Sequence, residues 1–193
     1  SVTNGLDANA GTTIAIDGVV TGRDISLASA DIGIAATGRV GTAGVTQGLT
    51  LANNDNEQQT FVGGTGTKNG YHVDADELTR LFGTDIVIFA PKVNAAGIDS
   101  VGSVAPPDVI VDGFTMTGGG SGSNLGANGS LTIRTPGKMR VIGNVQLTGL
   151  SDDNALNLFA DDALEVILGQ GTVRLLGANN APGGQLNMAS DDI

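Results

Sequence analysis

The most regular feature of the chain is a pair of aliphatic residues that flank one other residue and are bounded by Gly, Asn or Asp. Side chains that alternate in this way point to one face of a β-strand, so each pair predicts a short strand with both aliphatics directed inward. Strands this short need a large shared core. The predicted inward pairs are Ile14/Ile16, Ile25/Leu27, Ile32/Ile34, Leu49/Leu51, Ile86/Ile88, Val109/Val111, Leu131/Ile133, Val145/Leu147, Leu156/Leu158, Leu164/Val166, Val173/Leu175 and Leu186/Met188.

Two architectures place many short strands around a shared core: a β-sandwich and a parallel β-helix. The Asn-Gly turns that begin at Asn4, Asn69 and Asn128 suit the hairpins of a sandwich. The chain has few aromatic residues: five Phe, one Tyr and no Trp. This scarcity favours a β-helix, because its narrow core is filled by stacked aliphatic side chains. We therefore predict an all-β fold, a right-handed parallel β-helix (solenoid), and keep the sandwich as the alternative.

Internal similarity and glycine content both favour a solenoid. Residues 156–163 resemble residues 186–193 at an offset of 30, although no strict repeat runs through the chain. The chain has 31 Gly in 193 residues. Glycine inside a strand costs about 0.5–1 kcal/mol relative to Ala, so most of the glycines are expected at corners between strands.

One segment departs from the strand pattern and predicts a short helix over residues 74–82. Asp74 and Glu77 have the spacing of a capping box, in which each side chain accepts the other's backbone N–H. Leu78, Leu81 and Phe82 fall on one helical face, and Gly83 follows as a stop signal. Two glycine-rich stretches, 62–70 and 118–129, predict corner loops that project from the solenoid.

The charge narrows the classes of partner. Nine Lys and Arg against 20 Asp and Glu give a net charge of −11, which repels nucleic-acid phosphates and anionic lipid. No run of 18 or more apolar residues is present, so we expect no membrane insertion. The absence of Cys removes disulfides, thiol catalysis and cysteine zinc sites.

No catalytic, cofactor-binding or metal-binding residue is predicted. His72 is the single histidine, and no nucleophile elbow or phosphate-binding loop accompanies it. The Asp pairs are open to three interpretations: turn residues that bond nearby amides, calcium ligands, or carboxylates of a glycoside hydrolase. Adjacent Asp residues on a strand face opposite ways, so a catalytic dyad would need carboxylates from successive coils. The pairs are Asp152/Asp153, Asp161/Asp162 and Asp191/Asp192.

Three runs, 129–134, 143–148 and 162–168, resemble filamentous-haemagglutinin-type exoproteins. More broadly, the chain is similar in style to the large repetitive adhesins and autotransporter passenger domains of Gram-negative bacteria. This resemblance implies a right-handed parallel β-helix that is exported to the cell surface or beyond and is used as a stalk, adhesin or filament.

We expect one β-helical segment over residues 1–193, an internal stretch or repeat of a longer chain, because neither end has the polar cap that isolated solenoids need. The expected function is an extracellular structural or adhesive rod that is not an enzyme, with a surface glycan or receptor as a further partner. A polysaccharide-active β-helix enzyme, either lyase or glycoside hydrolase, and a calcium-stabilised binding module are the alternatives. Self-association, with a second copy or with neighbouring coils, is expected at the rod ends, through Ile14, Ile16, Leu186 and Met188.

Overall fold

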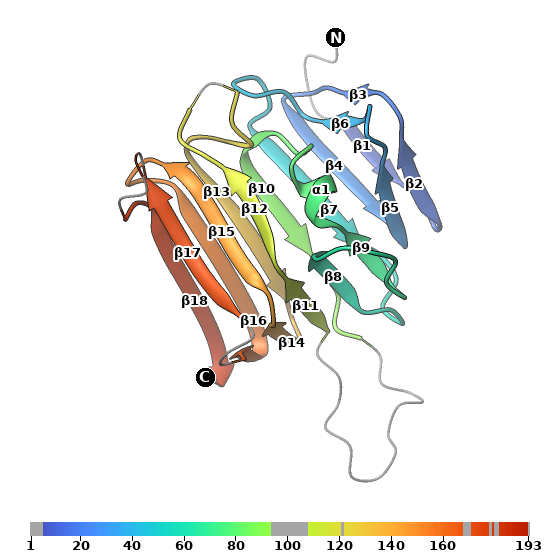
Figure 1. Cartoon of the computed structure of the whole chain (residues 1–193). Helices are drawn as coiled ribbons and strands as arrows, with labels where there is room; N and C mark the ends of the chain where they lie inside the picture. Colours follow the sequence, from blue (N-terminus) through green and yellow to red (C-terminus); the bar gives the residue numbers. More distant parts are fainter. Residues whose placement is uncertain are drawn as a thin grey trace.

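The computed structural model describes residues 6–93, 108–120, 122–167, 171–177, 179 and 182–192. It is all-β apart from one short helix, and one large parallel sheet curls into a half-barrel (Figure 1). Every strand pair among the described residues is parallel, and one isolated antiparallel bridge joins Leu176 to Pro182. The all-β class and the parallel pairing are as predicted, and no hairpin sandwich is present in this part of the chain.

The first ladder runs the whole length of the molecule. Its strands pair in parallel along one face, from the N-terminal to the C-terminal end in Figure 1. They are β1 (Leu6–Asn9), β4 (Asp24–Ser29), β7 (Gly48–Asn53), β10 (Gly83–Phe89), β13 (Leu125–Thr135), β16 (Ala155–Val166) and β18 (Gln185–Asp192).

Further ladders lie beside the first. The long strand β16 belongs to two of them, because its second half pairs with β14 and thereby turns the sheet around a corner. That second ladder contains β9 (Tyr71–Val73), β8 (Thr60–Gly63), β11 (Val109–Asp112) and β14 (Lys138–Val141). A third contains β12 (Phe114–Thr117), β15 (Asn144–Leu150) and β17 (Thr172–Gly177), and two short pairs are formed by β2 (Thr13–Ile16) with β5 (Asp31–Ile34) and by β3 (Val19–Val20) with β6 (Arg39–Val40).

Register stacks the inward side chains of the first ladder into two aliphatic columns. One column contains Leu6, Ile25, Leu49, Ile86, Leu131, Leu156 and Leu186, and the other contains Ala8, Leu27, Leu51, Ile88, Ile133, Leu158 and Met188. The side chains from β7 to β16 in these columns are fully buried. Burying one such side chain contributes about 1.5–3 kcal/mol, so the columns supply much of the stability of the fold.

Most of the predicted inward pairs are buried, and the exceptions lie on the outermost strands. Ile14 and Val166 are half-buried, as are Val173 and Leu175, while Leu186 and Met188 are 43% and 39% exposed. Alternation tells which face of a strand is apolar, but burial also requires a neighbouring coil, which these strands have on one side only.

Glycines form one of the corners in three successive coils. Gly63 and Gly113 have φ of +84° and +69°, values that glycine adopts without strain. A Cβ on Gly143 would lie 2.3 Å from the backbone N of Gly113, so the next coil also needs glycine here. The predicted glycine corners are confirmed at this position.

The helix is present but shorter than the predicted 74–82. The capping box is confirmed: Glu77 N donates to Asp74 Oδ1 at 2.7 Å, and Asp74 N donates to Glu77 Oε2 at 2.9 Å. The helix α1 covers only Ala75–Leu78, because Leu81 then forms a parallel bridge with Val40 of β6. Gly83 accordingly begins β10 instead of ending a helix.

The two predicted loops are also shorter than expected. Val62 and Gly63 belong to β8 and pair with β11, so the first loop covers 64–70. Leu125 begins β13, so the second loop is confined to residues before it, and its residue 121 lies outside the described residues. In both cases ladder pairing with a neighbouring coil extends a strand into a glycine-rich stretch.

Candidate functional site

The outermost strand of the first ladder carries exposed apolar side chains. β18 pairs with β16 on one edge, and no described residue pairs with its other edge. Leu186 and Met188 face the same way as the buried Leu156 and Leu158, with which they are in register. Strand β18 therefore has one edge without a ladder partner among the described residues, and it carries the exposed continuation of both aliphatic columns.

The other two predicted association residues lie at the opposite end of the molecule. Ile14 and Ile16 are on β2, which pairs with β5 and has no described partner on its other edge. Ile16 is 6% exposed and Ile14 is half-buried, so this edge is less open than that of β18. Figure 1 shows β2 and β18 at the two ends, so one chain does not bring the two pairs together.

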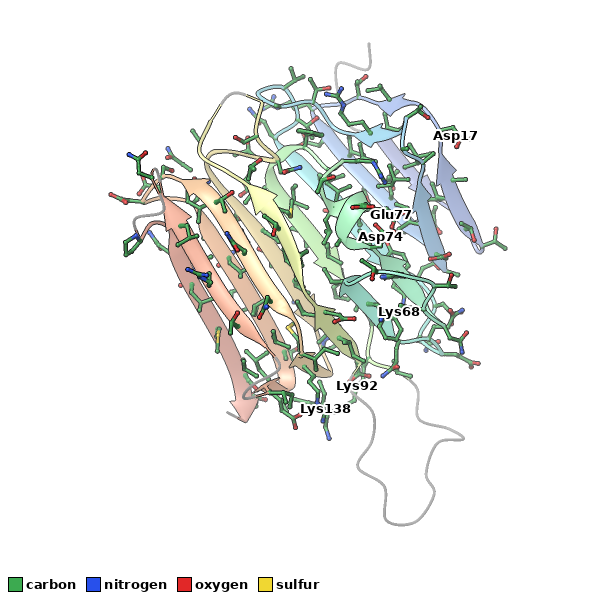
Figure 2. All side chains as sticks on the ribbon, viewed as in Figure 1. Asp17, Lys68, Asp74, Glu77, Lys92 and Lys138 are labelled. Carbon is green, nitrogen blue, oxygen red and sulfur yellow. The ribbon has the colours of Figure 1, made fainter. Side chains whose placement is uncertain are left out.

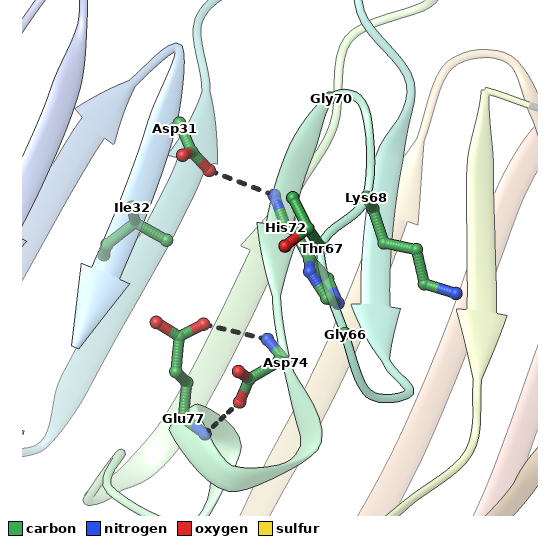
Figure 3. Close-up of a pocket in the computed structure, with 9 residues that line it drawn as sticks. All are labelled: Asp31, Ile32, Gly66, Thr67, Lys68, Gly70, His72, Asp74 and Glu77. Atoms are coloured by element: carbon green, nitrogen blue, oxygen red, sulfur yellow. Dashed lines mark hydrogen bonds between the residues drawn. The ribbon is translucent and has the colours of Figure 1, made fainter. Parts of the chain in front are cut away.

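A polar pocket of about 390 Å³ lies where two neighbouring strands fail to pair. β5 and β9 lie side by side, but no backbone ladder joins them (Figure 3). Side chains replace part of the missing ladder: Ile34 N donates to Glu77 Oε1 at 2.7 Å, and Arg80 Nη1 donates to Ile34 O at 2.8 Å. Glu77 of α1 and Arg80, which follows the helix, thus supply the acceptor and donor that a paired strand would have offered.

Both oxygens of the Glu77 carboxyl are used in holding the backbone. One accepts from Ile34 and the other from Asp74, at the front of the sheet where Figure 2 labels both acids. Burial raises the pKa of Glu77 above its ordinary value, and the two amide hydrogen bonds oppose that shift. Because each oxygen holds a backbone N–H, we assign this carboxyl the structural role of bridging the gap between β5 and the helical turn.

Asp31, Lys68 and His72, which also line this pocket, are engaged as well. His72 Nε2 lies 2.9 Å from Gly63 O, to which it donates, and its ring meets Phe61 edge to face. His72 N donates to Asp31 Oδ1 at 3.3 Å, and Lys68 Nζ forms an ion pair with Asp112 Oδ2 at 3.0 Å. The single histidine is therefore held by backbone and ring contacts, with no nucleophile among its described partners.

The Asp pairs lie at separate places in the structure. Asp152 and Asp153 are exposed in a turn, whereas Asp162 lies on β16 and forms an ion pair with Lys92. Asp161 and Asp191 come from successive coils and line one shallow pocket together with Arg134 and Phe159. Among the described residues no group of three or more His, Asp or Glu side chains could hold a metal ion.

Tyr71 cannot serve as a sugar platform, the role that a polysaccharide-active site would have required of it. Its side chain is fully buried, and its hydroxyl has no hydrogen-bond partner among the described residues. Burial, reinforced by the nearby charges of Asp31 and Glu77, raises the pKa of this hydroxyl. The ring belongs to the core.

No protein family model, curated protein or solved structure matches the chain. In the part of the chain that the structure describes, no helix is long and apolar enough to cross a membrane. The function must therefore be inferred from the ladders, the aliphatic columns and the exposed apolar side chains of β18.

Proposed function

We propose that the chain is a right-handed parallel β-helix that serves as an extracellular structural and adhesive rod. Three parallel ladders, whose strands stay in register apart from shifts in the β10–β13, β15–β17 and β16–β18 pairs, support a winding column in which each coil stacks on the one before. Crossover connections between parallel strands are right-handed in about 98% of cases, which favours this hand. The similarity in style to filamentous-haemagglutinin-type exoproteins of Gram-negative bacteria motivates the extracellular or cell-surface location.

The observation that carries the proposal is the exposed end of the two aliphatic columns. Leu186 and Met188 stand where the next coil would cover them, at 43% and 39% exposure, on a strand whose second edge has no ladder partner in the described part of the chain. A further coil, supplied for the isolated chain by a second copy, would bury both side chains and pair the backbone of β18. Such head-to-tail contacts produce open filaments when their rotation does not close.

Charge sets the conditions under which this assembly is expected. A net charge of −11 on each copy opposes association at low salt. At about 0.15 M ionic strength the screening length is about 8 Å, so the repulsion between copies is reduced while apolar contacts persist. Assembly should therefore increase with salt.

We propose a structural role for the chain and no catalytic activity. In the pocket between Asp161 and Asp191, acids of two different Asp pairs share a lining, yet both side chains are exposed to water. The general acid of a glycosidase is normally shielded from water. This favours a rod over a hydrolase.

Replacing Leu186 and Met188 together with Lys should keep the chain monomeric under conditions in which the wild type elongates. The substitutions place two charges where the next coil would pack, and burying an unpaired charge costs several kcal/mol. Analytical ultracentrifugation over a range of protein and salt concentrations, with electron microscopy of the same samples, measures the difference.

The matched control is Gln185→Lys with Asn187→Lys, which adds the same charge to the outward face of the same strand. This control should still assemble. A wild-type chain that sediments as a monomer at every concentration and salt would overturn self-assembly, and equal assembly by both double variants would overturn the role of the columns.

A further inference from the structure

Two arginines lie side by side on the outer face of the molecule. Val40 and Leu81 form a parallel bridge, with Val40 N donating to Arg80 O at 3.0 Å and Phe82 N donating to Val40 O at 2.8 Å. Val40 and Leu81 are fully buried. Since side chains alternate along a strand, the preceding residues of the two segments, Arg39 and Arg80, both point outward as cross-strand neighbours.

These arginines line a pocket of about 320 Å³ that contains no acidic residue. Its size is at the lower end of the roughly 300–1,000 Å³ range of ligand pockets. Residues from three parts of the chain form it, including Thr37, Thr79, Phe82 and Gly122. The two guanidinium groups thus share one concave, positively charged site on a protein whose net charge is −11.

The pairing of the two cations is unfavourable without a counter-ion. Like charges directly opposite each other on neighbouring strands are destabilising. The ion pairs of the described residues use Lys68, Lys92 and Arg140, and neither pocket arginine has a carboxylate partner. An anion placed between the two guanidinium groups would remove this repulsion and gain charge-assisted hydrogen bonds.

Both guanidinium groups are already oriented. The Arg39 group lies over the ring of Phe82, 5.1 Å from its centroid. Arg80 is anchored by its hydrogen bond to Ile34 O, which uses one N–H and leaves others for a ligand. Little side-chain freedom is therefore lost when an anion binds.

The threonines give the pocket a second kind of contact. Thr37 Oγ1 donates its proton to Asp17 O at 3.0 Å, and Thr79 Oγ1 donates to Asp76 O at 2.6 Å. Each hydroxyl oxygen keeps lone pairs that can accept hydrogen bonds, so the pocket offers acceptors for the hydroxyl groups of a ligand.

From these contacts we infer that the pocket between Arg39 and Arg80 binds a carboxylate-bearing sugar, with the carboxylate on the two arginines and ring hydroxyls on Thr37 and Thr79. A dense polyanion is disfavoured, because the net charge of the chain repels it beyond this one cationic site. A sugar with a single carboxylate satisfies both guanidinium groups without that repulsion.

This inference deepens the adhesive role and rests on the proposed function for its biological purpose. Binding and assembly are nevertheless separable measurements. The Leu186→Lys, Met188→Lys variant leaves this pocket intact, so a failure to bind sugar and a failure to form rods can be told apart.

The test is a titration of the isolated chain with galacturonic acid, which carries one carboxylate, followed by the NMR signals of the arginine side chains and by calorimetry. Galacturonic acid should shift the signals of Arg39 and Arg80, while neutral galactose should not. Arg39→Gln should weaken binding at least about tenfold, since it removes charged hydrogen bonds. Arg39→Lys keeps the positive charge but loses the planar guanidinium that can bind a carboxylate through two N–H groups, so it should give an intermediate affinity.

Arg174→Gln is the matched control, because it removes one exposed positive charge from β17, far from the pocket. Its affinity should stay within about twofold of wild type, as expected for a distant surface charge. Equal binding of galactose, equal binding of sodium sulfate (an adventitious anion only), or no difference between Arg39→Gln and Arg174→Gln would each overturn the inference.

Discussion

Leu158→Asp should unfold the chain or lower its melting temperature by about 10–20 °C, as about 5 kcal/mol does in a domain of this size. Leu158 is fully buried in the second aliphatic column, in register with Ile133 on one side and Met188 on the other. The substitution forfeits about 1.5–3 kcal/mol of apolar burial and places an unpaired carboxylate in the core. Thermal melting followed by circular dichroism measures the effect.

Asn157→Asp is the control for that experiment, since it adds the same charge one residue away on the outward face. Asn157 Nδ2 donates to Thr132 Oγ1 at 3.0 Å, so the control removes one hydrogen bond, worth about 0.5–1.5 kcal/mol. Equal melting temperatures for the two variants would show that the inward assignment of this strand is wrong.

Asn154→Ala should lower the free energy of unfolding by about 2–4 kcal/mol, because it leaves buried backbone groups without partners. Asn154 is fully buried at a corner between strands. Its Nδ2 donates to Gly126 O and Gly129 O, both at 2.9 Å, and its Oδ1 accepts from Ser151 N at 2.9 Å. One side chain therefore joins two successive coils and closes a turn. Urea denaturation, with the midpoint and slope compared to wild type, gives the change.

Asn154→Asp separates the donor function from the acceptor function at this corner. The carboxylate still accepts from Ser151 but cannot donate to the two glycine carbonyls, so Asn154→Asp should be at least as destabilising as Asn154→Ala. Asn144→Ala is the exposed comparison, where Thr172 Oγ1 donates to Asn144 Oδ1 at 2.7 Å, and it should cost less than about 1.5 kcal/mol. If Asn154→Ala lowers the free energy of unfolding no more than Asn144→Ala does, Asn154 does not stabilise the corner as described.

Local spacing made several features predictable from the sequence. The capping box depends on two residues three positions apart, and the inward pairs depend on residues two positions apart. Both patterns are carried within a few residues, so each could be read without knowing the neighbouring coils. The twelve pairs also predicted many short strands around an aliphatic core. The buried columns of the first ladder are built from five of these pairs and form part of the core that was expected.

Features that depend on pairing between coils could not be predicted in this way. Leu81 was expected on a helix, but a bridge to Val40, 41 residues earlier, ends the helix at Leu78. β9 pairs with β8 on one edge and faces β5 on the other without a ladder, and neither arrangement could be read from local spacing.

The arginine pocket was missed for the same reason. Arg39 and Arg80 are far apart in the sequence, and each alone reads as an ordinary surface charge. The contact between the Glu77 carboxyl and Ile34 of β5 was missed as well, although the capping box that Glu77 forms with Asp74 was predicted. The sequence offered one general indication. With only nine basic residues in the chain, two that lie next to each other in the fold are unusual.

The central claim is that each coil closes and stacks on the next along all three sides, and disulfide mapping tests it most directly because the chain has no Cys of its own. Two successive coils face each other at three outward pairs, one in each ladder, which are Thr132/Asn157, Arg140/Glu165 and Gln146/Arg174. Partners in register lie about 4.8 Å apart, within the reach of a disulfide, whose Cα atoms are usually about 4.4–6.8 Å apart.

Three double-cysteine variants, oxidised under native conditions and mapped by mass spectrometry, should each form the expected bond in nearly all molecules. The register-shifted pair Arg134 with Asn157 should not cross-link, because its partners are offset by two residues along the strands. Cross-linking at all three positions is the result that a closed, stacked coil predicts. Failure at any one of the three ladders, or equal cross-linking of the shifted pair, would contradict it.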